Sequence, residues 1–467
     1  MLKTEVQSLQ SILEKGKDRA ITIQEKVLVT YTEEISAEDP LAIFERMRKL
    51  EGDRSFWKSA TEPFYIITVG ENLRLTSNDG NRYEYTFQRW KEVRQRAIVY
   101  NPYHQEGTGL VLTGGMSFDV KEEKTSLWER YPHSEFVVPK FTFTKKGEKH
   151  YLTTAIYVSG ETSIDKQVKE IEEQKGILLA QGLPLKHQNT IVEKIEVKPT
   201  RWKESVKRAI DYIQENRAEK IVMARELRVR LSKKVEITPI LKQFLLLQQT
   251  SYLFAYERGD HCFIGATPER LVKIQGEKLL STCLAGTAPR GRTEEEDLAI
   301  KNNLFNDDKN RLEHDHVVQM IRNSITEYCS FLNIPEEPEV ITLKNLQHLY
   351  TPVVGELKEG YSVFDVIRRL HPTPALGGAP TEEALAFIRE HESFERGWYG
   401  SPVGWLDDRH NGEFAVAIRS GLIQGDEISL FAGCGVMGDS DVELEFEETA
   451  IKFLPMLTAL GDENESY

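Results

Sequence analysis

The sequence has few of the features that would place a protein outside the cytoplasm. Only four of its 467 residues are cysteines, and no two form a Cys-x-x-Cys pair. Scattered thiols in a chain of this length are typical of a reducing compartment rather than of a disulfide-stabilised secreted protein. No stretch approaches the roughly 18 apolar residues of a membrane span, and the first ten residues lack the apolar core of a signal peptide. We therefore expect a cytoplasmic protein with no membrane partner.

Positive charge is also in deficit. The formal net charge is -14, which argues against nucleic acid as a partner because the two would repel one another at long range. Signatures of zinc and calcium sites, such as His-Glu-x-x-His or an EF-hand loop, are absent as well. The composition is otherwise that of a globular protein, with 40 % hydrophobic and 29 % charged residues. An anionic substrate would need a locally positive site in so acidic a chain.

The apolar pattern of the first part of the chain is mostly that of strands. From about 27 to 160, short alternating runs separated by glycine- and asparagine-containing breaks predict a β-rich region with one helix near 85–95. Helical spacing of apolar residues predicts helices over 1–16 and 162–179. Residues 181–188 are the best candidate linker.

The second part mixes helices and strands. A helix with Trp202 and Val206 on its apolar face precedes a strand that starts at Lys220. Further helices are expected over 293–330 and 445–460, and further strands over 403–407, 414–419 and 428–432. We therefore divide the chain into an N-terminal region, 1–185, and a C-terminal region, 186–467.

Two residues are candidates for acid–base chemistry. Lys220 stands at a strand entrance, where a lysine is ordinarily a solvated end residue. It could act as a base if burial or neighbouring cations, such as Arg225 and Arg419, lowered its pKa from roughly 10.4. Glu269 closes the turn that starts at Gly265; it could pair with an arginine, or act as a general acid if burial or nearby carboxylates raised its pKa.

Three glutamates could hold a hard cation. Glu313 lies on the apolar face of its predicted helix, where a carboxylate costs free energy unless it is paired or metal-bound. Glu445 and Glu448 are three residues apart and share one helix face, although such faces are usually just solvated. Mg²⁺ typically takes one or two protein carboxylates, several waters and oxygens of the substrate. This split set of glutamates would suit Mg²⁺.

Other residues could receive an anion. Arg419 ends a predicted buried strand and needs an anionic partner, either an internal carboxylate or a substrate. Turns that contain glycine could donate backbone N–H groups to those oxygens of an anion that the arginine does not reach. Three such turns are Gly286-Thr287, Gly377-Gly378 and Gly433-Cys-Gly435. His348 could equally be a hydrogen-bonded core histidine. Cys434 does not lie in a Gly-x-Cys-x-Gly pattern, so we expect no nucleophilic role for it.

In this order, the motifs of the chain resemble those of the chorismate-utilising enzymes. The segments that carry the resemblance are Lys220-Ile-Val-Met-Ala-Arg, Gly265-Ala-Thr-Pro-Glu269-Arg-Leu, Leu284-Ala-Gly-Thr287, Lys309-Asn-Arg-Leu-Glu313-His, Leu346-Gln-His348-Leu, His371-Pro-Thr-Pro-Ala-Leu-Gly-Gly378, Ala417-Ile-Arg419 and Glu445-Phe-Glu-Glu448-Thr449-Ala-Ile-Lys452. The run Leu112-Thr-Gly-Gly-Met-Ser-Phe118 resembles the glycine pair of the family's N-terminal half. The resemblance implies an α/β (α+β) fold, with two large packed antiparallel sheets, helices outside, and the two halves interlocked as one body.

Within this family the chain resembles the isochorismate synthases, particularly the longer menaquinone-pathway type. Anthranilate synthases carry glutamine where Lys220 stands, and aminodeoxychorismate synthases carry a nucleophilic lysine where Ala285 stands. No glutamine amidotransferase module is present, which agrees with water as the nucleophile. The alternatives are a salicylate synthase, which also eliminates pyruvate, and an isochorismate synthase of a siderophore pathway. Retention of the acid, base and metal motifs argues against a non-catalytic chorismate-binding relative.

The resemblance also implies roles for single residues in an isomerase reaction. Lys220 would activate water for attack on ring carbon 2 of chorismate, and Glu269 would protonate the hydroxyl that leaves carbon 4. Glu313 and Glu448 match the ligands of Mg²⁺, and Glu445 matches a carboxylate that reaches the ion through water. The implied substrate contacts are Gly286, Thr287, His348, Arg419, Gly435 and Lys452.

One position departs from the family pattern. The residue three before Glu313 is usually acidic and is Asn310 here, so we expect a less negative metal site and weaker binding of Mg²⁺. The chain is expected to act as a monomer or homodimer.

Overall fold

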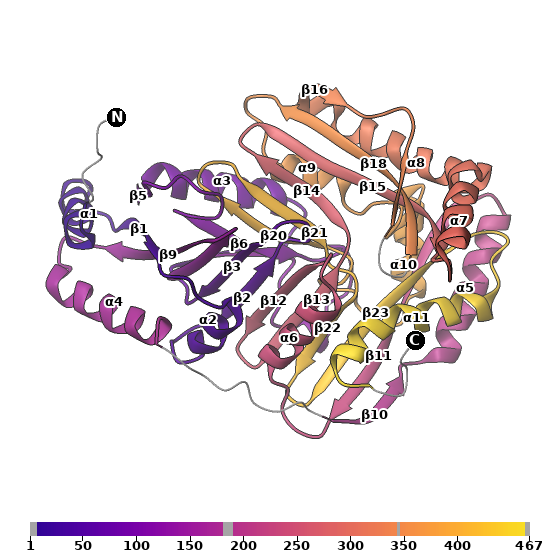
Figure 1. The fold of residues 1–467 in the computed structure, drawn as a ribbon, viewed down its shortest axis with the longest axis horizontal. Helices are drawn as coiled ribbons and strands as arrows, with labels where there is room; N and C mark the ends of the chain where they lie inside the picture. The colour runs from indigo at the N-terminus through magenta and orange to yellow at the C-terminus, as the bar shows by residue number, and fades with distance from the viewer. Residues whose placement is uncertain (1–6, 181–189, 343–345, 463–467) are drawn as a thin grey trace.

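The molecule is built on two β-sheets that pack face to face, with helices on the outside (Figure 1). The computed structural model describes residues 7–180, 190–342 and 346–462, without the side chains of Glu313 and Leu346. The predicted linker at 181–188 therefore lies outside the described residues. Across the described ranges, no helix combines the length and apolar character needed to cross a membrane.

The larger sheet has 13 strands and is almost entirely antiparallel; β1 and β5 pair in parallel. Its strands, in spatial order, are β10 (Ile191–Glu196), β11 (Lys220–Leu231), β23 (Glu427–Val436), β22 (Ser420–Gln424), β13 (His261–Thr267), β12 (Tyr252–Arg258), β2 (Arg54–Lys58), β3 (Phe64–Val69), β8 (Phe141–Lys146), β9 (Lys149–Val158), β1 (Val27–Ile35) and β5 (Ile98–Tyr100), with the short β19 (Gly378–Ala379) beside β11.

The smaller sheet has ten strands. Their order is β16 (Cys329–Asn333), β18 (Leu346–Leu357), β15 (Lys278–Pro289), β14 (Arg270–Gln275), β21 (Gly412–Val416), β20 (Pro402–Asp407), β6 (Val111–Met116), β7 (Ser134–Val138) and β4 (Leu73–Ser77), with β17 (Glu339–Thr342) beside β18. The expected class, two large sheets with outer helices, is confirmed.

The α-helices cover the outer faces of the sheets. They are α1 (Leu9–Ile23), α2 (Pro40–Met47), α3 (Arg82–Arg96), α4 (Ile164–Leu178), α5 (Pro199–Gln214), α6 (Ile237–Leu247), α7 (Glu294–Asn306), α8 (Asp308–Ile325), α9 (Val363–Leu370), α10 (Thr381–His391) and α11 (Val442–Ala459). For the site, α8 and α11 matter most, because α8 packs on β15 of the smaller sheet and α11 packs on β23 of the larger one.

Both sheets combine strands from the two predicted regions of the chain. In the larger sheet β2 pairs with β12, and in the smaller sheet β6 pairs with β20. An aromatic core fills the space between the sheets, where the rings of Phe64 and Trp405 are 5.2 Å apart. Within the smaller sheet, Gly114 of β6 lets β7 approach closely, since a Cβ there would lie 2.0 Å from the carbonyl oxygen of Glu135. The division at residue 185 remains a prediction.

Several element boundaries differ from those predicted. The helix expected over 293–330 is two helices, because Asp307 interrupts the first and caps the second by accepting a hydrogen bond from the Lys309 N–H. The strand expected over 414–419 ends at Val416, since Arg419 has φ 49° and turns the chain into β22. The turn at Arg419 thus separates β21 from β22.

Candidate active site

A cavity of about 2290 Å³ opens between the two sheets. Strands β11 and β23 of the larger sheet form one wall, strands β15 and β18 of the smaller sheet form the other, and α8 and α11 flank it. Every residue predicted to act in catalysis or to contact substrate lines this cavity: Lys220, Glu269, Gly286, Thr287, His348, Arg419, Gly435 and Lys452. Glu445 and Glu448, two of the predicted metal ligands, line it as well. The fold therefore gathers motifs that are spread over more than two hundred residues of sequence.

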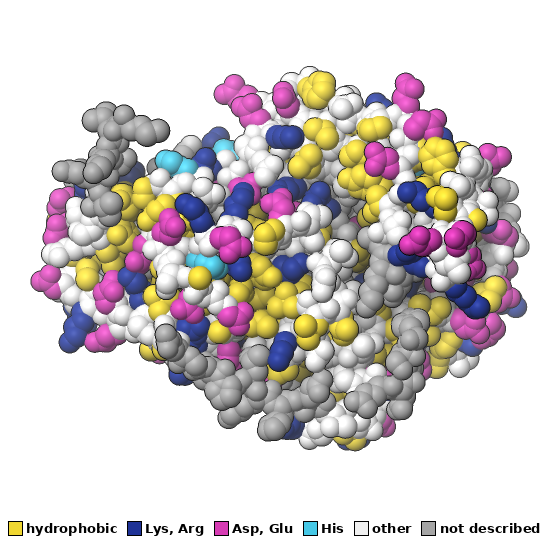
Figure 2. Space-filling view, viewed as in Figure 1, with side chains coloured by type: hydrophobic (Ala, Val, Ile, Leu, Met, Phe, Trp, Pro, Cys, Tyr) yellow, Lys and Arg dark blue, Asp and Glu magenta, His cyan; other side chains and the backbone are white. Residues whose placement is uncertain are grey.

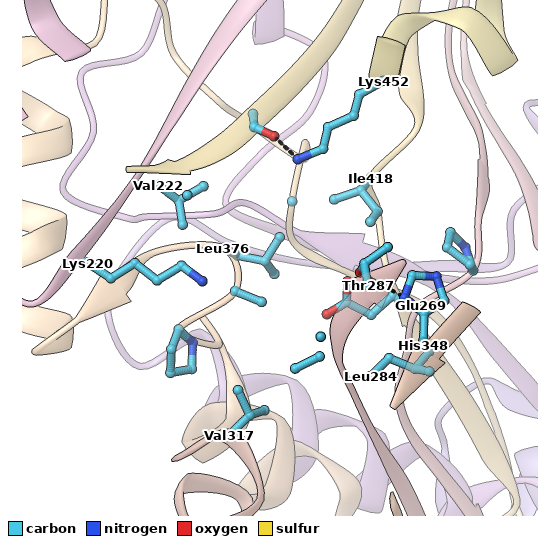
Figure 3. Close-up of a pocket in the computed structure, with 18 of the residues that line it drawn as sticks. Lys220, Val222, Glu269, Leu284, Thr287, Val317, His348, Leu376, Ile418 and Lys452 are labelled. Atoms are coloured by element: carbon cyan, nitrogen blue, oxygen red, sulfur yellow. Dashed lines mark hydrogen bonds between the residues drawn. The ribbon is translucent and has the colours of Figure 1, made fainter. Parts of the chain in front are cut away.

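Lys220 is the first residue of β11, and its amine points into the cavity (Figure 3). Its side chain passes directly over Gly435 of the neighbouring β23. A Cβ at position 435 would lie 2.6 Å from Lys220 Cε and 3.3 Å from Nζ. Gly435 is thus the residue whose missing side chain gives the lysine its path.

Arg225 does not join Lys220, and the expectation that it could is wrong. It is five residues further along the same strand, so its side chain projects from the opposite face. There its Nε donates to Thr449 Oγ1 at 2.6 Å, and its guanidinium lies 4.0 Å from the centre of the Phe446 ring. Arg225 thus connects β11 to α11 on the face of the strand opposite to that of Lys220.

Glu269 lies across the cavity from Lys220, in the turn between β13 and β14 (Figure 3). Its backbone is fixed at both ends: its N–H donates to Thr267 Oγ1 at 3.2 Å and its carbonyl accepts from the Val416 N–H at 3.0 Å. Burial raises the pKa of Glu269 to about 7, although Arg419 and Lys452 oppose that rise. Protein atoms surround the carboxyl, yet solvent still reaches it through the cavity. It can therefore hold a proton near neutral pH and deliver it into the cavity.

The wall beside Glu269 carries a polar pair on a bulge. The register of β15 shifts between Ala285 and Thr287, which leaves Gly286 at φ 78°. Only glycine adopts this conformation without strain. Thr287 Oγ1 lies 3.0 Å from His348 Nδ1 on the adjacent β18. Burial lowers the pKa of His348, and Arg419 lowers it further, so the ring is neutral at pH 7.

Arg419 supplies positive charge at the centre of the cavity. It is half-buried, and its left-handed backbone costs on the order of 1 kcal/mol. Its charge acts on Glu269, His348 and Tyr399. Lys220 and Lys452 add two more cations, but carboxylates such as Glu445 and Glu448 line the same cavity, and acidic and basic side chains are interspersed on the face in Figure 2. An anion would therefore be held by these three cations individually, not by the net charge of the cavity.

Helix α11 presents the two described carboxylates of the predicted metal site. Glu445 Oε1 accepts from Ser440 Oγ at 2.7 Å, whereas its Oε2 is buried with no hydrogen-bond partner among the described residues. Glu448 is half-exposed, and its Oε1 lies 2.5 Å from Lys452 Nζ, which also donates to the Gly433 carbonyl at 2.8 Å. An unpartnered carboxylate oxygen beside an accessible carboxylate is the oxygen donor set that Mg²⁺ prefers, so these residues fit the ion.

The opposite half of the predicted metal site is described only in part. The backbone of Glu313 belongs to α8, and its side chain lies outside the described residues. Asn310, one turn earlier, lines the cavity and donates from Nδ2 to Asp307 Oδ2 at 3.1 Å. The described side chains include no group of three potential metal ligands. The assignment of Glu313 stays a prediction.

Sequence reasoning missed the apolar residues that line the cavity. Figure 3 labels five of them: Val222, Leu284, Val317, Leu376 and Ile418. In the sequence they are indistinguishable from core residues, because only the placement of their strands and loops exposes them to a cavity. Cys434 behaves as expected: burial raises the pKa of its thiol well above the usual value, so it is no thiolate nucleophile.

Comparisons with known proteins identify the family and the fold of the chain. Residues 13–461 match the family described as chorismate binding enzyme. The chain is 40 % identical to the isochorismate synthase MenF of Bacillus subtilis over 95 % of this chain and 96 % of that one. It is 30 % identical to the salicylate biosynthesis isochorismate synthase of Pseudomonas aeruginosa, over 97 % and 94 % of the two chains. The solved structure of MenF, the menaquinone-specific isochorismate synthase of Escherichia coli, has a TM-score of 0.78 at 24 % identity, covers 97 % and 100 % of the two chains, and supports the fold.

Proposed function

The chain belongs to the chorismate binding enzyme family, and we propose that it is an isochorismate synthase, an Mg²⁺-dependent isomerase that converts chorismate to isochorismate for menaquinone biosynthesis. Its identity to the Bacillus subtilis enzyme extends over nearly the whole of both chains. The observation that carries the proposal is the placement of Lys220 and Glu269 on facing walls of one cavity.

The reaction exchanges one hydroxyl for another across the ring. Lys220 accepts a proton from a water molecule as the water oxygen forms a bond with ring carbon 2. Glu269 gives its proton to the hydroxyl on ring carbon 4 as that carbon–oxygen bond breaks, and the ring double bonds shift between the two carbons. One water enters and one leaves, so the product is an isomer of the substrate. An acid and a base on opposite sides are what this exchange requires.

The remaining residues would hold the substrate. Arg419 and Lys452 supply positive charge for its carboxylates, and Thr287 and His348 offer polar contacts beside the acid. The apolar side chains of the cavity suit the faces of the ring and limit access of other water molecules. Glu448, Glu445 and Glu313 would hold Mg²⁺, which supplies positive charge to neutralise the ring carboxylate.

The finer assignments form part of the same proposal. The partner is a small molecule, chorismate, and the reaction uses water with no glutamine amidotransferase subunit. We place the activity in the cytoplasm and expect a monomer or homodimer. The division into an N-terminal region, 1–185, and a catalytic region, 186–467, is proposed on the same basis.

The test is turnover by the purified protein. Chorismate and Mg²⁺ are supplied, the products are separated by chromatography, and pyruvate is assayed in the same samples. We expect isochorismate without pyruvate, and loss of product when the metal is chelated. Salicylate with an equal amount of pyruvate would instead identify a salicylate synthase, and chorismate left unconsumed would refute the proposal.

A further inference from the structure

A buried charged group begins at the residue that follows the proposed acid in the chain, and its three side chains do not line the cavity. Arg270 follows Glu269 in the chain, and consecutive residues of an extended segment project to opposite sides. Arg270 Nε donates to Tyr252 Oη at 2.7 Å, and Tyr252 Oη donates to Glu413 Oε1 at 2.8 Å. The arginine Nε is itself 3.4 Å from Glu413 Oε1. The three residues come from β14, β12 and β21, so they join both sheets.

The burial of this group makes its charges consequential. Tyr252 and Glu413 are each 1 % exposed. Burial raises the pKa of Tyr252 well above its usual value, so its hydroxyl stays protonated and can donate. Burial works against the charge of Arg270, but Tyr252 and Glu413 more than offset it, and the pKa of Arg270 is raised. The arginine is therefore a fixed cation in a region of low dielectric.

A neighbouring pair keeps the local charge in balance. Burial raises the pKa of Glu413, and the charges of Arg270 and Lys273 oppose that rise. Lys273 Nζ, on β14, also lies 2.5 Å from Glu62 Oε1. Two cations, Arg270 and Lys273, thus face two carboxylates, Glu413 and Glu62. Because opposite charges in contact cancel at a distance, little net field from this layer reaches Glu269.

On the cavity side of Glu269, by contrast, two cations act on its carboxyl. Charged and titratable groups from several elements line the cavity with it; they are Glu219, Lys220, Lys309, His316, Glu327, His348, Arg369, Arg396, Tyr399, Arg419, Asp439, Asp441, Glu445, Glu448 and Lys452. Of these, Arg419 and Lys452 already favour the ionised form of Glu269. A third cation would lower the pKa of Glu269 further and reduce the fraction that holds a proton at neutral pH.

We propose that Glu413 is a positioning residue for the acid: with Tyr252 it fixes and neutralises Arg270, so that Glu269 keeps its proton. This inference rests on the proposed function, since it presumes that Glu269 is the general acid. It assigns a role to a carboxylate that touches neither the cavity nor the substrate. Arg270, Tyr252 and Glu413 together would set the pH above which the enzyme loses activity.

The test compares variants that change the charge of this layer. Glu413→Gln leaves Arg270 uncompensated, so the alkaline limb of the kcat/KM profile should move down by about 0.5–1 pH unit, with turnover about three- to tenfold slower at pH 8. The double variant Arg270→Gln/Glu413→Gln removes both charges and should bring the limb back. A merely structural defect would lower the rate at every pH without moving the limb.

A matched pair of tyrosine variants serves if Glu413→Gln does not fold. Tyr256 lies on the same strand and is also 1 % exposed, but its hydroxyl donates to the Gly404 carbonyl at 3.2 Å. Tyr252→Phe removes a hydrogen bond that lowers the pKa of Glu413, so it should move the limb in the same direction as Glu413→Gln but by less, because Arg270 Nε and Glu413 Oε1 are already 3.4 Å apart. Tyr256→Phe should not move the limb. Equal limbs for the two variants, or an unmoved limb in a folded Glu413→Gln protein, would overturn the proposal.

A second readout does not need turnover. The pKa of Glu269 is obtained from urea unfolding between pH 5 and 9, by comparing each protein with the same protein carrying Glu269→Gln. If Glu413→Gln lowers this pKa while the wild-type protein fails to convert chorismate, the charge layer stands and the proposed function falls. If chorismate is converted and Glu413→Gln leaves the pKa of Glu269 unchanged, the proposed function stands and the positioning role of Glu413 falls.

Discussion

The two walls of the cavity differ in what fits their catalytic candidates, Lys220 and Glu269, for proton transfer. On the larger sheet, the candidate base depends on space: Gly435 offers no side chain, and Lys220 crosses it to reach the cavity. On the smaller sheet, the candidate acid depends on surroundings: burial holds the pKa of Glu269 near 7. The lesson is that one wall is sensitive to volume, whereas the other is sensitive to charge and solvent.

The largest effect is expected when either group is removed. Lys220→Ala and Glu269→Gln should each lower kcat by about 10²–10⁴-fold, because each deletes one proton transfer. Circular dichroism and thermal unfolding should show an intact fold. Near wild-type turnover in either variant would remove that residue from the acid–base pair.

A substitution that changes volume alone should affect the wall of the larger sheet. Gly435→Ala places a methyl group 2.6 Å from Lys220 Cε and must displace the lysine. We expect about a 10²-fold loss of kcat, since misplacing a catalytic group by about 1 Å has that cost.

The matched control is Gly438→Ala, in the segment that follows the same strand. Its nearest contact would be an ordinary 3.4 Å to Ile213. Equal rates for the two variants would show that the path of Lys220 is unimportant.

Between the walls, α11 offers a test of the metal site. Glu448→Gln should raise the Mg²⁺ concentration needed for half-maximal rate by about tenfold or more, because it removes one anionic ligand. The control is Glu447→Gln, an exposed neighbour on the same helix that lines no part of the cavity. An unchanged Mg²⁺ titration for Glu448→Gln would exclude this residue from the site.

The smallest expected effect is a change in the free energy of unfolding when Glu269 is replaced. The pKa of Glu269 rises on folding from 4.5 to about 7, so the folded state binds more protons between these values and its stability falls as the pH rises through about 7. Glu269→Gln should therefore stabilise the protein by about 1–3 kcal/mol at pH 8. At pH 4 it should have little effect. Urea unfolding at the two pH values measures the difference, and equal effects at both would contradict the raised pKa.

The sequence identified the candidate acid, the candidate base and most polar residues of the cavity because each stands in a short motif with its own spacing. Glu269, Thr287 and His348 were identified in this way, and all three line the cavity. The strand pattern likewise predicted β11 and the helical pattern predicted α5. Local patterns suffice where the property is local.

Other features depend on residues that are distant in sequence. No local pattern indicates that Gly435 makes room for Lys220, or that Glu413 bonds Tyr252, since those partners are 215 and 161 positions apart. The break at Asp307 and the left-handed Arg419 were missed for a different reason, because neither residue type forces its observed conformation.

The sharing of both sheets between the halves has a consequence for synthesis on the ribosome. Strand β2 remains an open edge until β12 has emerged about 200 residues later, and β6 waits even longer for β20. At ordinary elongation rates this interval lasts on the order of ten seconds or more. During it the nascent chain exposes unpaired strand edges, which favour association with other chains. Chaperone demand for this protein should therefore persist until β20, in its last third, has been translated.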